Sequence, residues 1–209
     1  MKKMTHRFDC MSIKRLSMGL DGNGIVSLVA GYGCPLACKY CLNPRCLNPD
    51  TKRNHYTTEQ LIEILKIDNL YFLATGGGVT FGGGEPLLQA AFIKEFCQQR
   101  PEGWNVNVET SLNVDLESVQ LLADEIALWI IDIKDMDPDI YHSYTGKDNS
   151  QVLTNLKWLS ENVDLNKVII RIPLIPDFNT VENQKSAQRK LEELGFHQFD
   201  VFHYIIREH

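Results

Sequence analysis

Short apolar runs typical of β-strands alternate with helical patterns along this chain. Six runs predict strands, at residues 24–30, 78–81, 104–109, 128–134, 167–172 and 199–204. Five stretches predict helices, at residues 58–67, 87–99, 116–123, 152–162 and 181–194. Strands that alternate with helices in this way predict an α/β fold with a parallel sheet and right-handed crossovers.

The number of strand–helix units and the chain length together predict the architecture. The chain has 209 residues, whereas a complete eight-stranded (β/α)8 barrel typically needs about 250. We therefore expect a partial (β/α)6 TIM-like barrel over residues 24–209, preceded by an N-terminal arm at residues 1–23. Chemistry in such barrels lies at the C-terminal ends of the strands. The polar segment 43–56 follows the first predicted strand and predicts a long loop at that end.

Composition excludes several classes of function. Lys plus Arg total 21 and Asp plus Glu total 27, and the resulting net charge of −6 argues against nucleic acid as the main partner. The longest unbroken apolar run, residues 126–131, is far shorter than a membrane-spanning helix of roughly 20 residues. We therefore expect no membrane partner and, because no apolar stretch follows the basic start, no secretory signal. Six cysteines then suggest a reducing compartment, and we expect a cytoplasmic protein.

A cluster of cysteines is the strongest chemical signal. Cys34, Cys38 and Cys41 follow the first predicted strand in a CxxxCxxC spacing. Three thiolates this close on one loop can converge on a soft metal centre. Iron–sulfur clusters are normally held by four cysteines, so three would leave one iron open for another ligand. Two alternatives remain, namely a zinc-binding module with Cys46 as the fourth ligand, and buried free thiols.

A glycine-rich segment at residues 75–86 surrounds the second predicted strand and includes the run Gly83-Gly84-Glu85-Pro86. A phosphate-binding loop is disfavoured, because no Gly-Lys-Ser/Thr sequence follows. Taken alone, such a segment is also typical of a flexible turn.

Together, the CxxxCxxC loop and the GGE-type run resemble the motifs of the radical SAM superfamily. The resemblance implies that Cys34, Cys38 and Cys41 hold a [4Fe-4S] cluster whose open iron is chelated by S-adenosylmethionine. An electron entering the cluster would cleave the sulfonium and release a 5′-deoxyadenosyl radical. Tyr40 fits the aromatic residue that often precedes the last cysteine in this superfamily, and we expect it to contact the cofactor.

The same resemblance assigns roles to the glycine-rich edge. It places Gly83 and Gly84 against the methionine amino group, with Glu85 nearby as an acceptor. Glycine allows the backbone to approach a ligand closely. The alternative for Glu85 is an acid at a helix N-terminus, favoured by the helix dipole, and both roles can hold together.

A longer resemblance, over nearly the whole chain, is to the glycyl-radical-enzyme activases. It rests on residues 76–80, Tyr40-Cys-Leu-Asn43, Asp132-Ile-Lys134 and Arg171. The resemblance implies that Asn43 binds the cofactor and that Asp132, Lys134 and Arg171 lie around the cofactor or substrate as catalytic residues. It also implies abstraction of hydrogen from a glycine of a partner glycyl radical enzyme, with flavodoxin or ferredoxin as electron donor.

Strand geometry supports a polar interior independently. Asp132 and Lys134 are two residues apart, so both side chains leave the same face of an extended strand. Glu109 shares a face of its strand with Asn105 and Asn107. If these faces point inward, the barrel has a polar lumen. The alternative is a solvent-facing ion pair at a strand end, which is commonplace.

Three departures from the activase pattern leave the partner open. Glu109 stands where activases have an aspartate. We therefore expect its carboxylate to bind the cofactor, on a side chain that is one methylene longer. The segment after the sixth predicted strand is short, with His203 and Tyr204 in the reverse of the family order. Together with Val26, which stands where activases have an arginine, this short segment favours an alternative function, namely a radical SAM enzyme that modifies a peptide or a small molecule.

Overall fold

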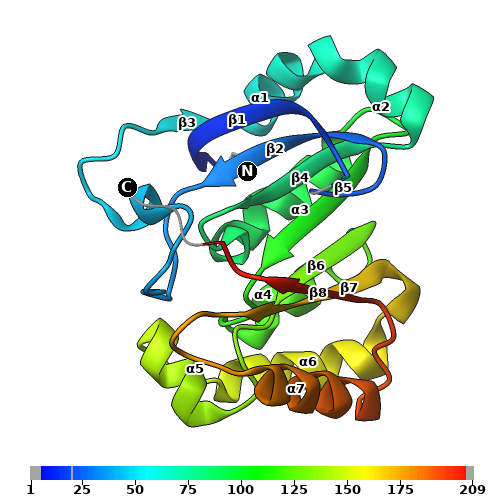
Figure 1. Ribbon diagram of the computed structural model, residues 1–209. Coiled ribbons are helices and arrows are strands. Elements are labelled where there is room, and N and C mark those ends of the chain that lie inside the picture. The colour runs from blue at the N-terminus through cyan, green and yellow to red at the C-terminus, as the bar shows by residue number, and fades with distance from the viewer. Residues whose placement is uncertain (1–5, 20, 206–209) are drawn as a thin grey trace.

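The computed structural model describes residues 6–19 and 21–205, and its strands form one eight-stranded sheet (Figure 1). In chain order the strands are β1 (Phe8–Met18), β2 (Ile25–Gly31), β3 (Asn54–Tyr56), β4 (Gly78–Gly83), β5 (Asn105–Thr110), β6 (Leu128–Asp132), β7 (Val168–Leu174) and β8 (Phe199–His203). They lie side by side in the order β3-β1-β2-β4-β5-β6-β7-β8. β3 and β8 are therefore the two edges, and the barrel is open between them.

The parallel part of the sheet confirms the predicted partial (β/α)6 barrel. The six predicted strands correspond to β2 and to β4 through β8, and each pairs in parallel with the next. Their C-terminal ends therefore meet at one edge of the sheet, as helical crossovers of one hand require. The loops that follow these strand ends carry the predicted site.

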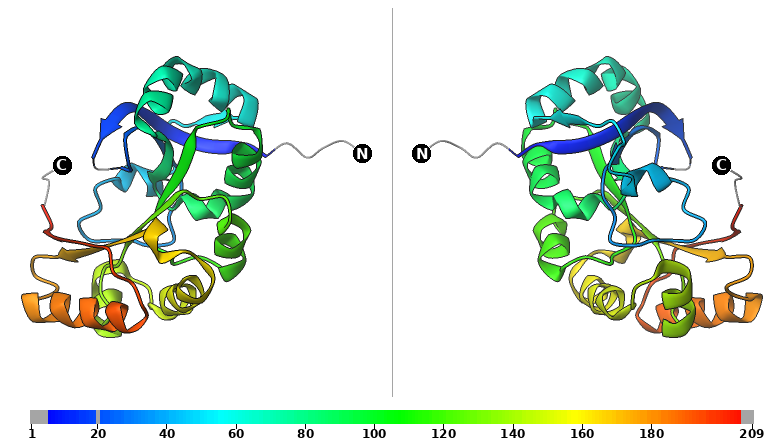
Figure 2. Two further views of the ribbon diagram at one scale, coloured as in Figure 1. Left: turned by 90° about the vertical axis from the view of Figure 1, so that its right-hand side faces the viewer. Right: turned by 90° about the vertical axis from the view of Figure 1, so that its left-hand side faces the viewer.

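Helices cover the outer side of the curved sheet (Figure 2). Their bounds are α1 (Thr58–Leu65), α2 (Asn69–Thr75), α3 (Ala90–Gln99), α4 (Leu116–Leu122), α5 (Pro138–Thr145), α6 (Ser150–Asn162) and α7 (Val181–Glu193). Four short 3-10 helices, η1 (Pro44–Leu47), η2 (Lys66–Asp68), η3 (Pro86–Gln89) and η4 (Leu165–Lys167), lie in the connections. The five predicted helices are confirmed; α2 and α5 are additional to them.

Local capping signals explain where several of these helices begin. Thr57 and Gln60 form a capping box at the start of α1, each side chain bonding the other residue's backbone N–H. Asp137 accepts hydrogen bonds from the backbone of Asp139 and Ile140 at the start of α5, and Pro138 occupies the first helical position.

Residues 8–18, which fall within the expected N-terminal arm, form strand β1 of the same sheet. β1 pairs antiparallel with β2 and with β3. Phe8 and Cys10 are buried, whereas the second half of the strand is largely exposed. Arg15 on this strand forms an ion pair with Asp68, a fully buried carboxylate that also accepts a hydrogen bond from Ser27 of β2 at 2.8 Å. These contacts attach β1 firmly to the first parallel strand.

The two faces of the parallel strands differ in chemistry. Trp129 and Ile131 of β6 belong to the hydrophobic core between the sheet and the helices. Asp132 alternates with them and lies on the inner face, as does Glu109 of β5 next to the core residue Val108. The core is therefore on the helix side of the sheet, and the lumen is lined by polar and charged side chains.

Within the described part of the chain, none of the helices has the length and apolar character needed to span a bilayer.

Candidate active site

The loop that carries the three cysteines lies directly after β2, at the C-terminal edge of the sheet (Figure 1). Its backbone is held against the end of α5. Ala37 N–H donates to the carbonyl of Thr145 at 2.9 Å, and Lys39 N–H donates to the carbonyl of Tyr144 at 3.1 Å. These carbonyls belong to the last turn of α5, where a helix leaves acceptors without a partner within the helix. The loop therefore uses them as its anchor.

The three cysteine side chains are half-buried on this loop. Cys34 and Cys38 pack against the edge of the hydrophobic core, and Leu36 between them is buried. Burial raises the pKa of the Cys38 thiol to about 11, and the nearby Lys134 ammonium works in the opposite direction. Glu85 lies within electrostatic range of Cys34. The structure therefore brings the cysteine loop, the glycine-rich edge and the charged strand ends together.

Cys46 lies beside two of the three loop cysteines. Its thiol is buried, and the side chains of Cys34 and Cys41 are the neighbours that most strongly raise its pKa. The side chain of Cys46 is in turn the main cause that lowers the pKa of Cys34. The backbone holds this arrangement, because Gly33 N–H donates to the carbonyl of Cys46 at 3.0 Å.

The glycine-rich edge is bonded to the residues that lead into the cysteine loop. Gly84 N–H donates to the carbonyl of Gly31 at 3.0 Å, and Glu85 N–H donates to the carbonyl of Gly33 at 2.8 Å. A Cβ at Gly84 would lie 2.2 Å from the Gly33 oxygen, so only glycine allows this approach. The motif therefore fixes the position of the cysteine loop through its backbone.

Glu85 is a buried carboxylate that binds the protein itself through both oxygens. Oε1 accepts from Thr110 Oγ at 2.7 Å and from Leu87 N–H at 3.2 Å. Oε2 accepts from the N–H and the hydroxyl of Ser111, at 2.9 and 2.7 Å. Burial raises the pKa of this carboxyl, although the four hydrogen bonds oppose the shift. Glu85 therefore caps η3 and ties the end of β4 to the end of β5.

The predicted charged residues lie on the inner side of β5, β6 and β7, with Lys134 two residues beyond the end of β6. Glu109 accepts from Arg171, with 2.8 Å between Oε1 and Nη1. Lys134 Nζ lies 3.4 Å from Asp132 Oδ2, and the lysine side chain is only 14% exposed. Asp200 of β8 lies 3.6 Å from Arg171 Nε. Asp132 and Lys134 do form an ion pair, but the alternative that it faces solvent is wrong, because the lysine side chain is largely buried.

Burial and neighbouring charges shift the pKa values of this face. Burial raises the pKa of Glu109 to about 7 against the opposing effect of Arg171, and Asp132 adds to the rise. Burial disfavours the charged form of Lys134, but the carboxylate of Asp132 outweighs it and the net effect raises the lysine pKa. The pKa of Arg171 is also raised, because Glu109 and Asp132 outweigh its burial. Both cations therefore stay charged at neutral pH.

Aromatic side chains pack around Tyr40 on one side of the cysteine loop. Tyr40 donates to Asp177 Oδ2 at 2.9 Å, and its carbonyl accepts a hydrogen bond from the Tyr204 hydroxyl. The Tyr40 ring meets the rings of Tyr144 and Phe178 edge to face, with centroids 6.2 and 5.6 Å apart. Of these residues, the sequence motifs assigned only Tyr40 to the site. Its neighbours come from the last turn of α5 and from the segments after β7 and β8, and no local spacing relates them to it.

Asn43 is the one predicted site residue with an exposed side chain on the outer part of the loop. It precedes η1 without bonding that turn through its side chain. It lines a small hollow of about 150 Å³ together with Met11, Ser12 and Arg45. The structure gives Asn43 no contact with the charged lumen.

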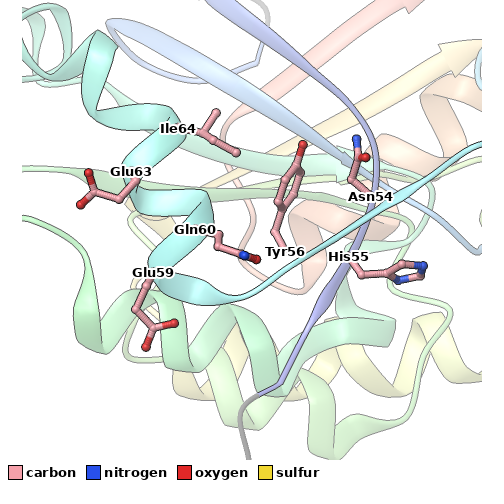
Figure 3. Close-up of a pocket in the computed structure, with 7 residues that line it drawn as sticks. All are labelled: Asn54, His55, Tyr56, Glu59, Gln60, Glu63 and Ile64. Atoms are coloured by element: carbon pink, nitrogen blue, oxygen red, sulfur yellow. The ribbon is translucent and has the colours of Figure 1, made fainter.

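A larger hollow, of about 550 Å³, lies away from this site between β3 and α1 (Figure 3). The side chains that line it are those of Asn54, His55, Tyr56, Glu59, Gln60, Glu63 and Ile64. Neither the cysteines nor the charged strand ends contribute to it.

The donor set fits an iron–sulfur cluster. Three half-buried thiols share one loop, next to an apolar core edge that limits access of water. Among residues 6–19 and 21–205, no three His, Cys, Asp or Glu side chains are grouped to hold one metal ion. Lys134 and Asp132 next to Cys38 offer both signs of charge to a zwitterionic ligand.

Comparison with known families decides between the cluster and the zinc alternative. The model of the radical SAM superfamily matches residues 28–189, which is most of the chain. The chain belongs to the radical SAM superfamily. A radical SAM enzyme uses a [4Fe-4S] cluster and S-adenosylmethionine, and these are the cofactors of this enzyme.

Two curated radical SAM relatives cover most of the chain. The (2S)-3-sulfopropanediol dehydratase activating enzyme of Klebsiella oxytoca is 39% identical, over 84% of this chain and 74% of that protein. The pyruvate formate-lyase-activating enzyme of Staphylococcus aureus is 30% identical, over 87% of this chain and 78% of that protein. The resemblance to the activase branch of the superfamily is therefore confirmed.

Solved structures support the fold alone. SuiB of Streptococcus suis superposes with a TM-score of 0.65 and 17% identity, over 86% of this chain and 39% of that one. The AdoMet-bound anSMEcpe structure gives a TM-score of 0.61 and 19% identity, over 83% of this chain and 50% of that one. The chain thus spans half or less of each of these larger proteins, over the partial barrel that it shares with them.

Proposed function

We propose that this radical SAM enzyme activates a glycyl radical enzyme, by removing a hydrogen atom from a glycine Cα of that partner. The proposal is supported by two relatives that are named as activating enzymes and that each align with more than four-fifths of the chain. It is also supported by a charged lumen beside the cysteine loop, open at one side of the barrel.

The cofactors supply the radical chemistry when bound. With the cluster held by Cys34, Cys38 and Cys41, one electron and bound S-adenosylmethionine would supply the radical chemistry that converts the partner's glycine to a glycyl radical and leaves methionine and 5′-deoxyadenosine. The residues of this chain then have the tasks of binding, orientation and exclusion of water.

Cys34, Cys38 and Cys41 would hold the cluster, since they are the three thiols on the loop that α5 anchors. Gly83 and Gly84 present backbone at the adjoining edge. We assign Glu85 to fixing that edge, because both of its oxygens already accept hydrogen bonds from the protein.

The charged face would orient the methionine moiety of the cofactor and the substrate glycine. Lys134 suits the carboxylate of a zwitterion, and Asp132 suits its ammonium group. Glu109 and Arg171 form the next ion pair along this face, and their bond fixes the carboxylate of Glu109. Tyr40 is placed to act through packing, because its hydroxyl is bound to Asp177. Asn43, on the exposed side of the loop, would meet a cofactor only if the loop closes over it.

The open side of the barrel suits a peptide loop as the substrate. β3 and β8 are the two edges of the sheet and do not pair with each other, so the lumen has lateral access. A glycine on a projecting loop can enter such an opening, whereas a closed barrel would exclude it. Tyr204, which donates to the Tyr40 carbonyl, marks one border of this entry.

The electron would come from an acidic donor such as flavodoxin or ferredoxin. Lys39, Arg45 and Lys52 are exposed on and next to the cysteine loop. This local basic group contrasts with the net charge of −6 for the chain. Six free thiols among the described residues suit the reducing cytoplasm as the site of this reaction.

The test is activation of a candidate partner under anaerobic conditions. Reduced enzyme, S-adenosylmethionine and a glycyl radical enzyme encoded by the same organism should give a doublet electron paramagnetic resonance signal. The doublet arises from the remaining α-hydrogen, so it reports the glycine directly. One 5′-deoxyadenosine should form for each radical.

A partner with that glycine replaced by alanine is the matched control, and it should give no doublet. If every candidate partner stays silent while 5′-deoxyadenosine forms with a short peptide or a metabolite, the activase proposal is wrong. The alternative of peptide or small-molecule modification would then be correct.

A further inference from the structure

The loop between β7 and α7 contacts the cysteine loop through a carboxylate. Asp177 on this loop accepts a hydrogen bond from the Tyr40 hydroxyl, with 2.9 Å between Oη and Oδ2. Tyr40 lies between Cys38 and Cys41, so the bond ties the second half of the cysteine loop to a different part of the barrel. The CxxxCxxC motif does not include this carboxylate, which is 137 positions from Tyr40 in the sequence.

Asp177 has an unusual backbone conformation. Its φ of +66° is in the left-handed region, which glycine adopts readily and other residues rarely adopt. Glycine would be the easier residue here on backbone grounds, but it has no side chain that could bond Tyr40. Backbone outliers of this kind cluster at functional sites, so the carboxylate is a candidate for a role in the site.

The turn that carries Asp177 is fixed to the barrel by Asn179. The Asn179 side chain bonds the backbone at the end of β7 and at the start of the loop. Its amide also donates to Oδ2 of Asp135, a buried residue in the segment after β6, at 3.1 Å. Asp177 therefore meets Tyr40 from a turn that is bonded to the ends of two strands.

Packing orients the Tyr40 ring for this bond. The ring meets those of Tyr144 and Phe178 edge to face, and the Tyr40 carbonyl accepts a hydrogen bond from the Tyr204 hydroxyl. Phe178 directly follows Asp177, so one turn contacts Tyr40 through both a ring and a carboxylate. The backbone bonds from α5 hold the first half of the cysteine loop, and the contacts of Tyr40 extend this support towards the last cysteine.

We propose that Asp177 is a positioning residue that acts through Tyr40. The bond holds the Tyr40 ring, and with it the two cysteines on either side, in the arrangement that binds the cluster and S-adenosylmethionine. Residues that are fixed before a ligand binds lose less conformational freedom when it does. Asp177 therefore raises the affinity for S-adenosylmethionine and slows loss of the cluster without contacting either cofactor.

The inference rests on the assignment of the cluster to the cysteine loop and not on the proposed activase function. Its test reads the cofactors alone, without a partner enzyme, so its failure and the failure of the proposed function are distinguishable. Asp177→Gly removes the carboxylate and relieves the positive φ, whereas Asp177→Asn keeps an acceptor oxygen. Tyr40→Phe removes the hydroxyl and keeps the ring. Tyr56→Phe, in the hollow between β3 and α1, is the matched control for loss of a tyrosine hydroxyl.

Anaerobic, cluster-loaded variants should be compared for the rate of iron release to a ferrous chelator and for binding of S-adenosylmethionine in equilibrium dialysis. Asp177→Gly and Tyr40→Phe should each speed iron release and weaken binding about five-fold or more, because hydrogen bonds to charged groups are among the stronger ones in proteins. The double variant should show no larger effect than either single variant, since both remove the same bond. Asp177→Asn and Tyr56→Phe should stay close to wild type.

The melting temperature separates positioning from folding. That of Asp177→Gly should remain close to wild type, because relief of the strained φ offsets the lost bond. A melting temperature several degrees below wild type that Asp177→Asn does not restore would assign Asp177 to folding of its turn and overturn the proposal. Wild-type iron release and cofactor binding in Asp177→Gly would also overturn it, as would effects of Asp177→Gly and Tyr40→Phe that add in the double variant.

Discussion

Glu109 on β5 and Arg171 on β7 are joined by an ion pair that crosses β6, with 2.8 Å between Oε1 and Nη1. Asp132 of β6 lies opposite Arg171 in the register of the sheet. Asp200 of β8 approaches the same guanidinium, at 3.6 Å. The guanidinium of Arg171 thus lies among carboxylates from three strands. The charged side chains of the lumen are therefore close enough to influence one another.

This coupling predicts a stability that depends on pH through Glu109. Burial raises its pKa to about 7, compared with about 4.3 for an unfolded glutamate. Between these values the folded protein keeps a proton that the unfolded chain has released. The contribution of Glu109 to stability is therefore present at low pH and is lost as pH rises through this window, by roughly 4 kcal/mol at most.

Glu109→Gln removes this titration. The melting temperatures of wild type and Glu109→Gln should be measured at pH 5 and at pH 8 on anaerobic, cluster-loaded protein. From pH 5 to pH 8, the melting temperature of the wild type should fall by several degrees more than that of Glu109→Gln. Glu102→Gln, at an exposed position, is the control and should follow the wild type. Parallel profiles for wild type and Glu109→Gln would contradict the prediction.

Glu85 should act mainly on stability. Replacement by alanine leaves the hydroxyls of Thr110 and Ser111 and two backbone N–H groups without their acceptor. Buried donors without a partner cost about 1–3 kcal/mol each, and partial rearrangement or water recovers some of this. Glu85→Ala should therefore lower the melting temperature by about 6 °C or more, whereas Glu102→Ala should not. A normal melting temperature with weakened cofactor binding would favour direct contact with the cofactor instead.

The parallel barrel could be predicted from the sequence because its signals are local. Each parallel strand is a short apolar run, and helices begin at caps such as Thr57 with Gln60. β1 was missed for a physical reason. Its second half is exposed and includes Lys14 and Arg15, so the alternation that marks a buried strand is confined to Phe8 and Cys10.

The site was predictable only where its residues are close in sequence. The cysteine loop and the strand-end pair Asp132 and Lys134 have fixed spacings, and the structure brings both into one region. The partners of Glu85 could not be predicted, because Thr110 and Ser111 approach it only when β4 and β5 pair. The Tyr204 contact with Tyr40 joins residues 164 positions apart and depends on the curvature of the whole sheet.

Lys134 should contribute to cofactor binding more than to folding. Losing one charged contact to a bound ligand costs about 1.5–3 kcal/mol, which corresponds to roughly ten-fold weaker binding or more. Lys134→Ala should show this loss in equilibrium dialysis of S-adenosylmethionine against cluster-loaded protein, with little change in melting temperature. Lys157→Ala on the outer side of α6 is the exposed control. A large melting shift with unchanged binding would mean that the pair with Asp132 is structural.

The basic group near the cysteine loop should steer the electron donor. Two of the basic residues near the loop already have partners within the protein. Arg53 lies over the Tyr32 ring at 4.0 Å, and both Arg53 and His55 approach Asp9. Lys39, Arg45 and Lys52 are the exposed members that remain available to an acidic partner. Electrostatic steering raises association rates by about ten-fold or more and is screened by salt, with a Debye length of about 8 Å at physiological ionic strength.

Arg45→Glu with Lys52→Glu should therefore slow reduction of the cluster by reduced flavodoxin or ferredoxin about ten-fold at low salt, in stopped-flow absorption measurements. The difference from wild type should shrink as salt is added, because screening removes the long-range attraction in the wild type and the repulsion in the variant. Lys157→Glu with Lys185→Glu changes the net charge equally on α6 and α7 and is the control, since those helices lie on the outer side of the sheet. Equal slowing by both double variants would show an effect of net charge alone. A reduction rate that depends on neither salt nor these substitutions would mean that the donor binds at another face of the protein.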